Sequence, residues 1–117
     1  MKKIYHLSTC STCQKILEEL KPPSSFILQD IKETAVTEVQ LEEMYQYTES
    51  YEALFSKRAK LYKEKDLKNA NLDEEAYKNL ILEHYTFLKR PVIINNDKIF
   101  IGNSPKVVKA AKDSMNE

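Results

Sequence analysis

An α/β fold around one mixed four-stranded sheet is predicted by three features of the sequence. Two short apolar runs with a helical pattern between them lie near the start of the chain. A hairpin pattern followed by a helix start lies near its end. The chain also contains a single glycine in 117 residues, which argues against an all-β fold with many tight turns. Its length suits one ordinary domain that can bury a core without disulfide bridges.

The first half of the predicted sheet lies before residue 31. Residues 3–7 form an apolar run typical of a strand, and residues 13–21 show helical spacing until Pro22 stops the helix. The apolar run Phe26–Leu28 then suits a second, buried strand. A strand, a helix and a strand in this order predict a right-handed crossover between two parallel strands.

Helices are expected in the middle of the chain. Thr37 and Gln40 have the spacing of a capping box, and apolar residues follow them at helical intervals. A short helix is expected at Tyr51–Ser56, and the charged segment 57–72 is expected to form solvated helix and loop. Asp73 can cap a further helix. The predicted inner face of that helix consists of Tyr77, Leu80, Ile81, His84 and Leu88.

The end of the chain predicts a hairpin and a last helix. Arg90-Pro91 is expected to end the preceding helix. Two β-rich runs then flank Asn95-Asn96-Asp97, residues that tolerate the positive φ of tight turns. Ser104 and Pro105 suit the N-cap and N1 positions of a helix over residues 105–115.

The complete order is β-α-β, a helical block and then β-β-α, which is the plan of a thioredoxin-like fold. We therefore expect residues 1–117 to form a single thioredoxin-like domain with a helical insertion at about residues 37–88. No internal repeat or low-complexity stretch indicates a linker or a second domain.

Charge and hydropathy argue against several classes of partner and location. The 18 basic and 18 acidic residues give a formal net charge of zero, so direct binding to nucleic acid or an anionic membrane is not expected. No apolar run suits a membrane span, and the first residues lack the apolar core of a signal peptide. We therefore expect a cytoplasmic protein whose two cysteines stay reduced and serve catalysis or metal binding.

The pair Cys10 and Cys13 is the strongest functional signal in the chain. The predicted order of strand, loop and helix puts Cys10 just before a helix N-terminus and Cys13 one turn inside the helix. The N–H groups and the dipole of such a terminus lower a cysteine pKa and favour the reactive thiolate. We therefore expect Cys10 to be the nucleophile and Cys13 the resolving thiol, with Ser11 and Thr12 in the loop that wraps an oxyanion.

Two arginines are candidates for binding that oxyanion. Arg90 precedes Pro91, and in a thioredoxin-like fold this X-Pro bond is usually cis and abuts the cysteine loop. A guanidinium at this place can bind an oxyanion through two parallel hydrogen bonds. Arg58 is the second candidate, although a solvated face is the other interpretation of its charged segment.

Other interpretations of the cysteines and histidines stay open. The cysteine pair can form half of a zinc site with His6 and His84 as the other half, but the chain has no second cysteine pair. Cys13 can instead be a buried helix residue with no role in resolution. His84 suits a core or helix-end position, and His6 can either modulate Cys10 or be structural. Neither a metal nor a tightly bound organic cofactor is expected.

Three segments resemble the arsenate reductase family of the glutaredoxin-coupled type. They are KIYHLSTCSTCQKIL, ALFSKRAKLYKE and LKRPVIINNDKIFIGNSPKVV, and together they extend over nearly the whole chain. The resemblance implies that Cys10 attacks arsenate, that Arg90 helps to hold the oxyanion and that His6 lies near the nucleophile. It also implies a reductant: glutathione or another small thiol, acting with glutaredoxin or thioredoxin as the protein partner.

The chain departs from the arsenate reductases at three places. Those enzymes use three arginines, and this chain has Ser56 and Asn103 at two of the positions, so that only Arg90 is retained. Arg58 matches the pattern of a branch that includes the Spx-type transcription regulators. Cys13 also resembles that branch, in which a CxxC pair works as an internal redox switch.

The sequence therefore predicts a thiol-dependent oxidoreductase of this family, which reduces an oxyanion or a thiol or disulfide substrate through a Cys10–Cys13 redox centre. The alternative is an Spx-like regulator that is switched by oxidation and binds the α subunit of RNA polymerase. Those regulators dock through a surface that includes a glycine between the inserted helices, and the matching segment YTESYEALF contains none.

Overall fold

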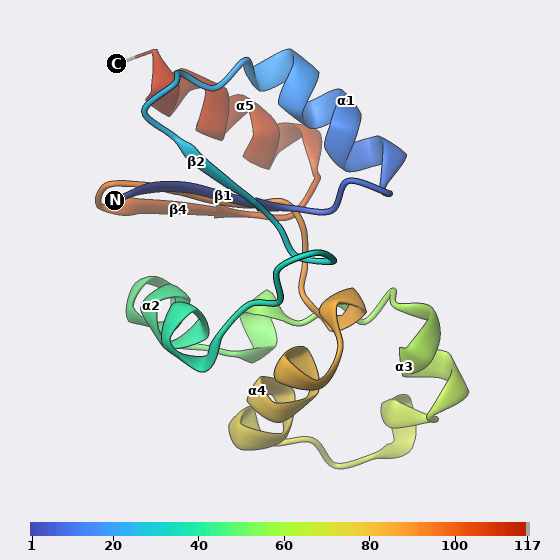
Figure 1. The fold of residues 1–117 in the computed structure, drawn as a ribbon. Coiled ribbons are helices and arrows are strands. Elements are labelled where there is room, and N and C mark those ends of the chain that lie inside the picture. Colours follow the sequence, from blue (N-terminus) through green and yellow to red (C-terminus); the bar gives the residue numbers. More distant parts are fainter. Residues whose placement is uncertain (117) are drawn as a thin grey trace. The chain divides into compact units, whose positions relative to one another are not determined.

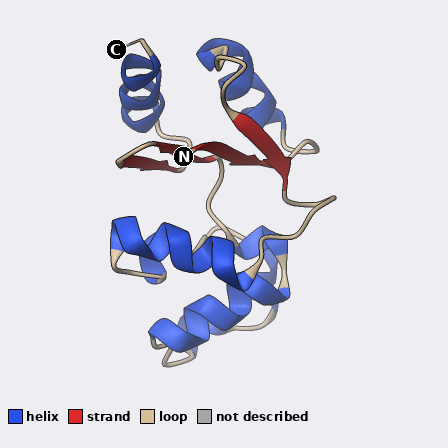
Figure 2. Cartoon of the chain, turned by 60° about the vertical axis from the view of Figure 1, so that its left-hand side comes forward, coloured by secondary structure: helices blue, strands red, loops and turns tan. Residues whose placement is uncertain are grey.

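In a computed structural model of the chain, the described residues are 1–116, and they fall into two compact units (Figures 1 and 2). The sheet unit consists of Met1–Thr34 and the residues from Arg90 onward. The helical unit consists of Ala35–Lys89. That the two units act as a single domain stays a prediction.

The sheet unit has the predicted mixed four-stranded sheet, in the order β2-β1-β3-β4. β1 and β2 are parallel, and β3 runs antiparallel to both β1 and β4. The α/β, thioredoxin-like fold class is therefore confirmed, with β-α-β at the start and β-β-α at the end. The elements are β1 (Lys2–His6), α1 (Ser11–Leu20), β2 (Ile27–Asp30), β3 (Val92–Asn95), β4 (Lys98–Ile101) and α5 (Pro105–Met115).

The helices α1 and α5 lie on one face of the sheet (Figure 1). Ile4 of β1 is paired with Ile93 of β3, and both side chains point to this face because side chains alternate along a strand. The apolar stripes of the two helices pack against them, which removes apolar area from water and stabilises this unit. The complete cluster is Ile4, Ile16, Leu20, Phe26, Ile93, Val108 and Ala111.

The helical unit is held together by aromatic packing. The Phe55 ring stacks on Phe87 with ring centroids 5.2 Å apart and meets the Tyr77 ring at 4.9 Å. Backbone hydrogen bonds join the same two segments, since the Ser56 N–H donates to the Phe87 carbonyl at 2.7 Å. The elements are α2 (Glu38–Thr48), η1 (Glu52–Leu54), α3 (Lys60–Glu64), η2 (Leu67–Asn69), α4 (Glu74–Glu83) and η3 (Tyr85–Phe87), where η marks a short 3-10 helix.

The predicted helix starts are confirmed wherever a capping residue signalled them. Thr37 and Gln40 form a reciprocal capping box at the start of α2. The Asp73 side chain accepts the N–H of Ala76 at the start of α4, and the Ser104 side chain accepts the N–H of Val107 at the start of α5. No helix within residues 1–116 is long and apolar enough to cross a membrane.

The end of α4 was predicted wrongly. The helix stops at Glu83, because His84 has extended backbone with φ −150° and so leaves the helical path. Its side chain instead accepts the N–H of Thr86 at 3.0 Å and caps η3. His84 is therefore a helix-end residue, and Leu88 lies beyond η3 rather than on the inner face of α4.

Three boundaries in the sheet unit also differ from the predictions, since β1 spans Lys2–His6 rather than residues 3–7. The prediction that the second strand is buried is wrong as well, because Ile27 and Leu28 are exposed. α1 begins at Ser11 rather than at residue 13, because the turn before it leads the backbone directly into the helix. β2 spans Ile27–Asp30 rather than Phe26–Leu28, because its pairing with β1 runs from Lys3 opposite Ile27. Register with a partner strand, rather than the apolar run, sets these strand ends.

Candidate active site

One edge of the sheet gathers residues that are far apart in the sequence. His6 and Asp30, the last residues of β1 and β2, face each other at this edge. β3 runs antiparallel to β1, so it begins at the same edge, directly after the Arg90-Pro91 peptide bond. That bond is cis, as the sequence predicted. The N–H of Gly102 donates to the Pro91 carbonyl at 3.0 Å and ties the end of β4 to the same place.

Cys10 is the N-cap residue of α1, at the end of a tight turn that follows β1. Its N–H donates to the Leu7 carbonyl at 3.0 Å, which closes the turn. Its own carbonyl accepts the Gln14 N–H at 3.1 Å and starts the helix. The first turn of α1 contains no acidic residue that would occupy the free N–H groups of the terminus.

The surroundings of Cys10 favour its thiolate. Partial burial acts to raise its pKa, but the N–H and thiol of Cys13, the N–H of Thr12 and the charge of Arg90 together outweigh this effect. The pKa of Cys10 therefore lies below its ordinary value. The neutral side chain makes no cap hydrogen bond. Because a thiol is a weak acceptor, these donors act mainly on the ionised sulfur.

Cys13 has the opposite character. Its side chain is only 1% exposed, and burial raises its pKa to about 11. The negative charge of Cys10 acts in the same direction, while the backbone of Leu7 acts against it. At neutral pH Cys13 thus keeps its proton and donates it to the Cys10 sulfur. The pair places a sulfur whose pKa is lowered beside a thiol whose pKa is raised, and both are free cysteines.

The other predicted residues of the sheet unit lie around this pair. Arg90 is close enough for its charge to act on both sulfurs. Ser11 and Thr12 form the exposed first residues of α1. His6 is partly buried at the end of β1, and its Nδ1 is buried with no hydrogen-bond partner among residues 1–116.

Two predicted residues lie in the helical unit. The structure does not fix the position of Arg58 relative to Cys10, so its role in oxyanion binding stays a prediction. His84 is engaged in the cap of η3. Within the described part of the chain, no three His, Cys, Asp or Glu residues lie together as a metal ion would require.

The sequence analysis missed Ser8 in the cysteine turn and two residues that bind it, Asp30 of β2 and Gln14 of α1. Ser8 donates through its N–H and its hydroxyl to the carboxylate of Asp30, and its carbonyl accepts from the Gln14 side chain at 3.1 Å. An acidic residue just after a predicted parallel strand was the available signal for Asp30. It was overlooked because the predicted strand ended at Leu28.

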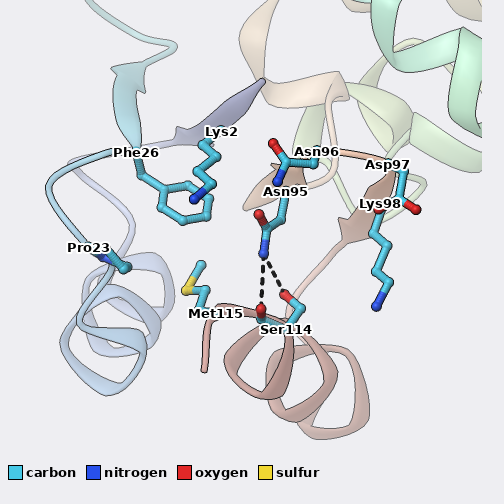
Figure 3. A pocket seen from close by; sticks show the side chains of 9 residues that line it. All are labelled: Lys2, Pro23, Phe26, Asn95, Asn96, Asp97, Lys98, Ser114 and Met115. Atoms are coloured by element: carbon cyan, nitrogen blue, oxygen red, sulfur yellow. Dashed lines mark hydrogen bonds between the residues drawn. The ribbon is translucent and has the colours of Figure 1, made fainter. Parts of the chain in front are cut away.

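A small cavity lies at the opposite end of the sheet unit, between the β3–β4 turn and the end of α5 (Figure 3). Asn95 donates there to the carbonyl and the hydroxyl oxygen of Ser114 at 3.2 and 3.1 Å. The Lys2 ammonium lies 6.0 Å from the centre of the Phe26 ring. These contacts hold the ends of the strands and helix together, and the cavity has no link to the cysteines.

Two known proteins are similar to this chain over most of its length. An arsenate reductase of Haemophilus influenzae is 29% identical over 110 residues, which is 90% of this chain and 93% of that protein. The uncharacterized protein YfgD of Escherichia coli is also 29% identical over 110 residues, 91% of this chain and 92% of that one.

Solved structures give the same result for the fold. An arsenate reductase from Vibrio cholerae has a TM-score of 0.73 and 27% identity, and the match covers 94% of this chain and 96% of that one. The model of the ArsC family matches residues 5–111, a span that includes both cysteines, the cis bond and the last helix start. The chain belongs to the ArsC family.

Proposed function

We propose that the protein is a thiol oxidoreductase that reduces an oxyanion, with Cys10 as the nucleophile. One observation carries the proposal: the Cys10 sulfur lies at the N-terminus of α1, where the N–H groups of Thr12 and Cys13 and the charge of Arg90 lower its pKa. These groups stabilise the attacking sulfur and are also the donors that a bound oxyanion needs.

Arsenate is the proposed substrate because it fits both the site and the names of two relatives. The proteins from H. influenzae and V. cholerae are named arsenate reductases, and they match this chain over most of its length. Arg90 can meet two oxygens of a tetrahedral oxyanion at once. A single arginine in the sheet unit near the cysteines makes a weaker anion site than several would, so we expect a high KM for arsenate.

The proposed reaction has two steps. The Cys10 thiolate attacks arsenic, an S–As bond forms, and one arsenate oxygen leaves as water after taking up protons. A second sulfur then attacks Cys10, the S–As bond breaks, and its electron pair stays on arsenic, which leaves as arsenite. If Cys13 is that second sulfur, its proton passes to an arsenite oxygen and a Cys10–Cys13 disulfide remains.

The reductant must then restore the free thiols. Glutathione or another small thiol, with glutaredoxin or thioredoxin, can supply the electron pair by thiol–disulfide exchange. The buried position of Cys13 favours attack by the incoming thiolate on the partly exposed Cys10 sulfur.

A coupled assay of arsenate reduction tests this proposal. It uses wild type, Cys10→Ser and Cys13→Ser, with glutathione and glutaredoxin in one arm and with thioredoxin in the other. We expect turnover in wild type and none in Cys10→Ser. Loss of turnover in Cys13→Ser only in the thioredoxin arm assigns resolution to Cys13, whereas no wild-type turnover in either arm contradicts the proposal.

A redox-switched regulator that binds the RNA polymerase α subunit is the second candidate. The contact between the Cys13 thiol and the Cys10 sulfur favours it, because an internal switch needs only this pair. A binding measurement with purified α subunit, on the reduced and the oxidised protein, separates the candidates. Binding that depends on oxidation supports the regulator, and equal absence of binding in both states opposes it.

A further inference from the structure

The carboxylate of Asp30 accepts hydrogen bonds from the cysteine turn. Its Oδ1 accepts the Ser8 N–H at 3.3 Å and the Lys32 N–H at 3.2 Å, and its Oδ2 accepts the Ser8 hydroxyl. The hydrogen bond from that hydroxyl is the main cause that lowers the pKa of Asp30. Asp30 therefore stays ionised at neutral pH and accepts from both donors of Ser8.

Ser8 is also held from the side of the helix. Its carbonyl accepts the side-chain N–H of Gln14, which lies one turn into α1. The N–H, the hydroxyl and the carbonyl of Ser8 are thus all bound, two of them to the end of β2 and one to α1. Ser8 lies inside the turn that the hydrogen bond from Cys10 to Leu7 closes, so its position determines where the turn delivers Cys10.

We propose that Asp30 is a positioning residue that fixes Ser8, and through Ser8 the turn Leu7–Cys10, so that the Cys10 sulfur stays at the N-terminus of α1. This role of Asp30 rests on the proposed function of Cys10 as a nucleophile. It does not require Asp30 to touch a substrate. The stabilisation of the thiolate depends on the direction and distance of N–H groups, which a loosened turn would change.

A purely electrostatic role of Asp30 would have the opposite sign. A carboxylate near a thiolate disfavours ionisation, so removing the charge alone would lower the pKa of Cys10 and speed its reactions. Loss of positioning would raise that pKa and slow them. The other titratable groups of the sheet unit that bear on this comparison are His6, which faces Asp30, and Arg90 and Cys13, which act on Cys10.

The test measures the rate of Cys10 alkylation by iodoacetamide from pH 5 to 10, with the modified cysteine identified by mass spectrometry. The variants are Asp30→Asn, Ser8→Ala and the double variant. Asp113→Asn is the matched control, since that exposed carboxylate lies on α5 and forms an ion pair with Lys109 at 3.4 Å. Urea unfolding midpoints show that each variant is folded.

We expect Asp30→Asn to slow alkylation at pH 7 about threefold to tenfold and to shift the pH profile of Cys10 upward by about half a unit to one unit. Ser8→Ala should act in the same direction and less strongly, because its backbone N–H still reaches Asp30. Alkylation in the double variant should be as fast as in the slower of the two single variants, since both changes break the same connection between Asp30 and Ser8. Asp113→Asn should match wild type.

Three outcomes would overturn the proposal. They are faster alkylation in Asp30→Asn, no change in Asp30→Asn and Ser8→Ala, or additive effects in the double variant. The readout needs no substrate and no reductant. A protein without any arsenate turnover can still support the positioning role of Asp30, so failure here and failure of the proposed function are told apart.

Discussion

The N-termini of α1 and α2 share one spacing and differ in chemistry. In α2, the Thr37 hydroxyl oxygen accepts the Gln40 N–H at 3.1 Å, and the Gln40 side-chain oxygen accepts the Thr37 N–H at 3.1 Å. In α1 the corresponding N-cap and N3 residues are Cys10 and Cys13. α2 therefore begins with a closed pair of hydrogen bonds, whereas α1 begins with a pair of thiols.

The comparison shows how the cysteine site is built from an ordinary helix start. At α1 the N-cap N–H is satisfied by the Leu7 carbonyl, so the N3 side chain is not needed as its acceptor. The Cys13 thiol is left to donate to the Cys10 sulfur. A capping box stabilises the resting helix, while the terminus of α1 gives its strongest stabilisation to the thiolate.

Cys10→Ser is the change with the largest expected effect, because it gives α1 the kind of N-cap that α2 has. Arsenate turnover should fall by several orders of magnitude, since a serine hydroxyl does not ionise at neutral pH. The free energy of unfolding should stay equal or rise by about 0.5–1 kcal/mol, because serine is a good N-cap. Activity assays and urea unfolding check both statements, and turnover within tenfold of wild type would contradict the first.

The raised pKa of Cys13 makes stability depend on pH in the alkaline range. In the unfolded chain the thiol ionises near its ordinary value of 9.0, whereas the folded protein holds the proton up to about 11. As pH rises between these values the unfolded state loses the proton first, so the stability falls. Relative to Cys13→Ala, the loss should reach up to about 2–3 kcal/mol.

The measurement for Cys13 is urea unfolding of both proteins at several pH values between 8 and 11. The alanine variant serves as the control because it retains every lysine and tyrosine, and both proteins carry Cys10→Ser so that a changed titration of Cys10 does not contribute. Parallel curves for the two proteins would show that burial of this thiol does not hold its proton.

Thr37→Ala tests the other half of the comparison. Removal of the α2 cap should reduce the free energy of unfolding by about 1 kcal/mol, because the Gln40 N–H loses its acceptor. The rate of Cys10 alkylation should not change. Thr37→Ser retains the hydroxyl and should remain close to wild type, and an equal loss in both variants would mean that packing, not capping, is responsible.

Arg90→Gln has the smallest expected effect. The charge of Arg90 is the last of the causes that lower the pKa of Cys10, behind the donors of Cys13 and Thr12. Alkylation at pH 7 should therefore slow about twofold to fivefold. Arg90→Lys should recover most of the rate because it keeps the charge. If Arg90→Gln slowed Cys10 alkylation more than Asp30→Asn does, the charge of Arg90 would matter more to Cys10 than the positioning by Asp30, contrary to the proposed order.

Much of the fold follows from short-range patterns. A capping hydrogen bond joins residues two or three positions apart, so a helix start can be predicted from neighbouring residues. Three starts were marked in this way, by Thr37 with Gln40, by Asp73 and by Ser104 with Pro105. The hairpin between β3 and β4 is equally local, and its turn contains Asn96 at φ 56°. Cys10 makes no such cap, and its place at the start of α1 was predicted instead from the local order of strand, loop and helix.

The ends of elements and the surroundings of Cys10 were decided by tertiary structure. α4 stops at Glu83 although apolar spacing continues, because His84 turns to cap the next segment. Asp30 reaches Ser8 only because the parallel register of β1 and β2 places their last residues, His6 and Asp30, opposite each other.

The sequence by itself thus determined the order of elements, the cysteine pair and the place of Cys10 at a helix terminus, since these depend on neighbours in the chain. The tertiary structure decided which residues stand beside that thiol and how they alter its pKa. Arg90 and Asp30 are separated from Cys10 by long stretches of chain. Hydrogen bonds and charges act over a few ångströms, so only strand pairing can bring these groups within range.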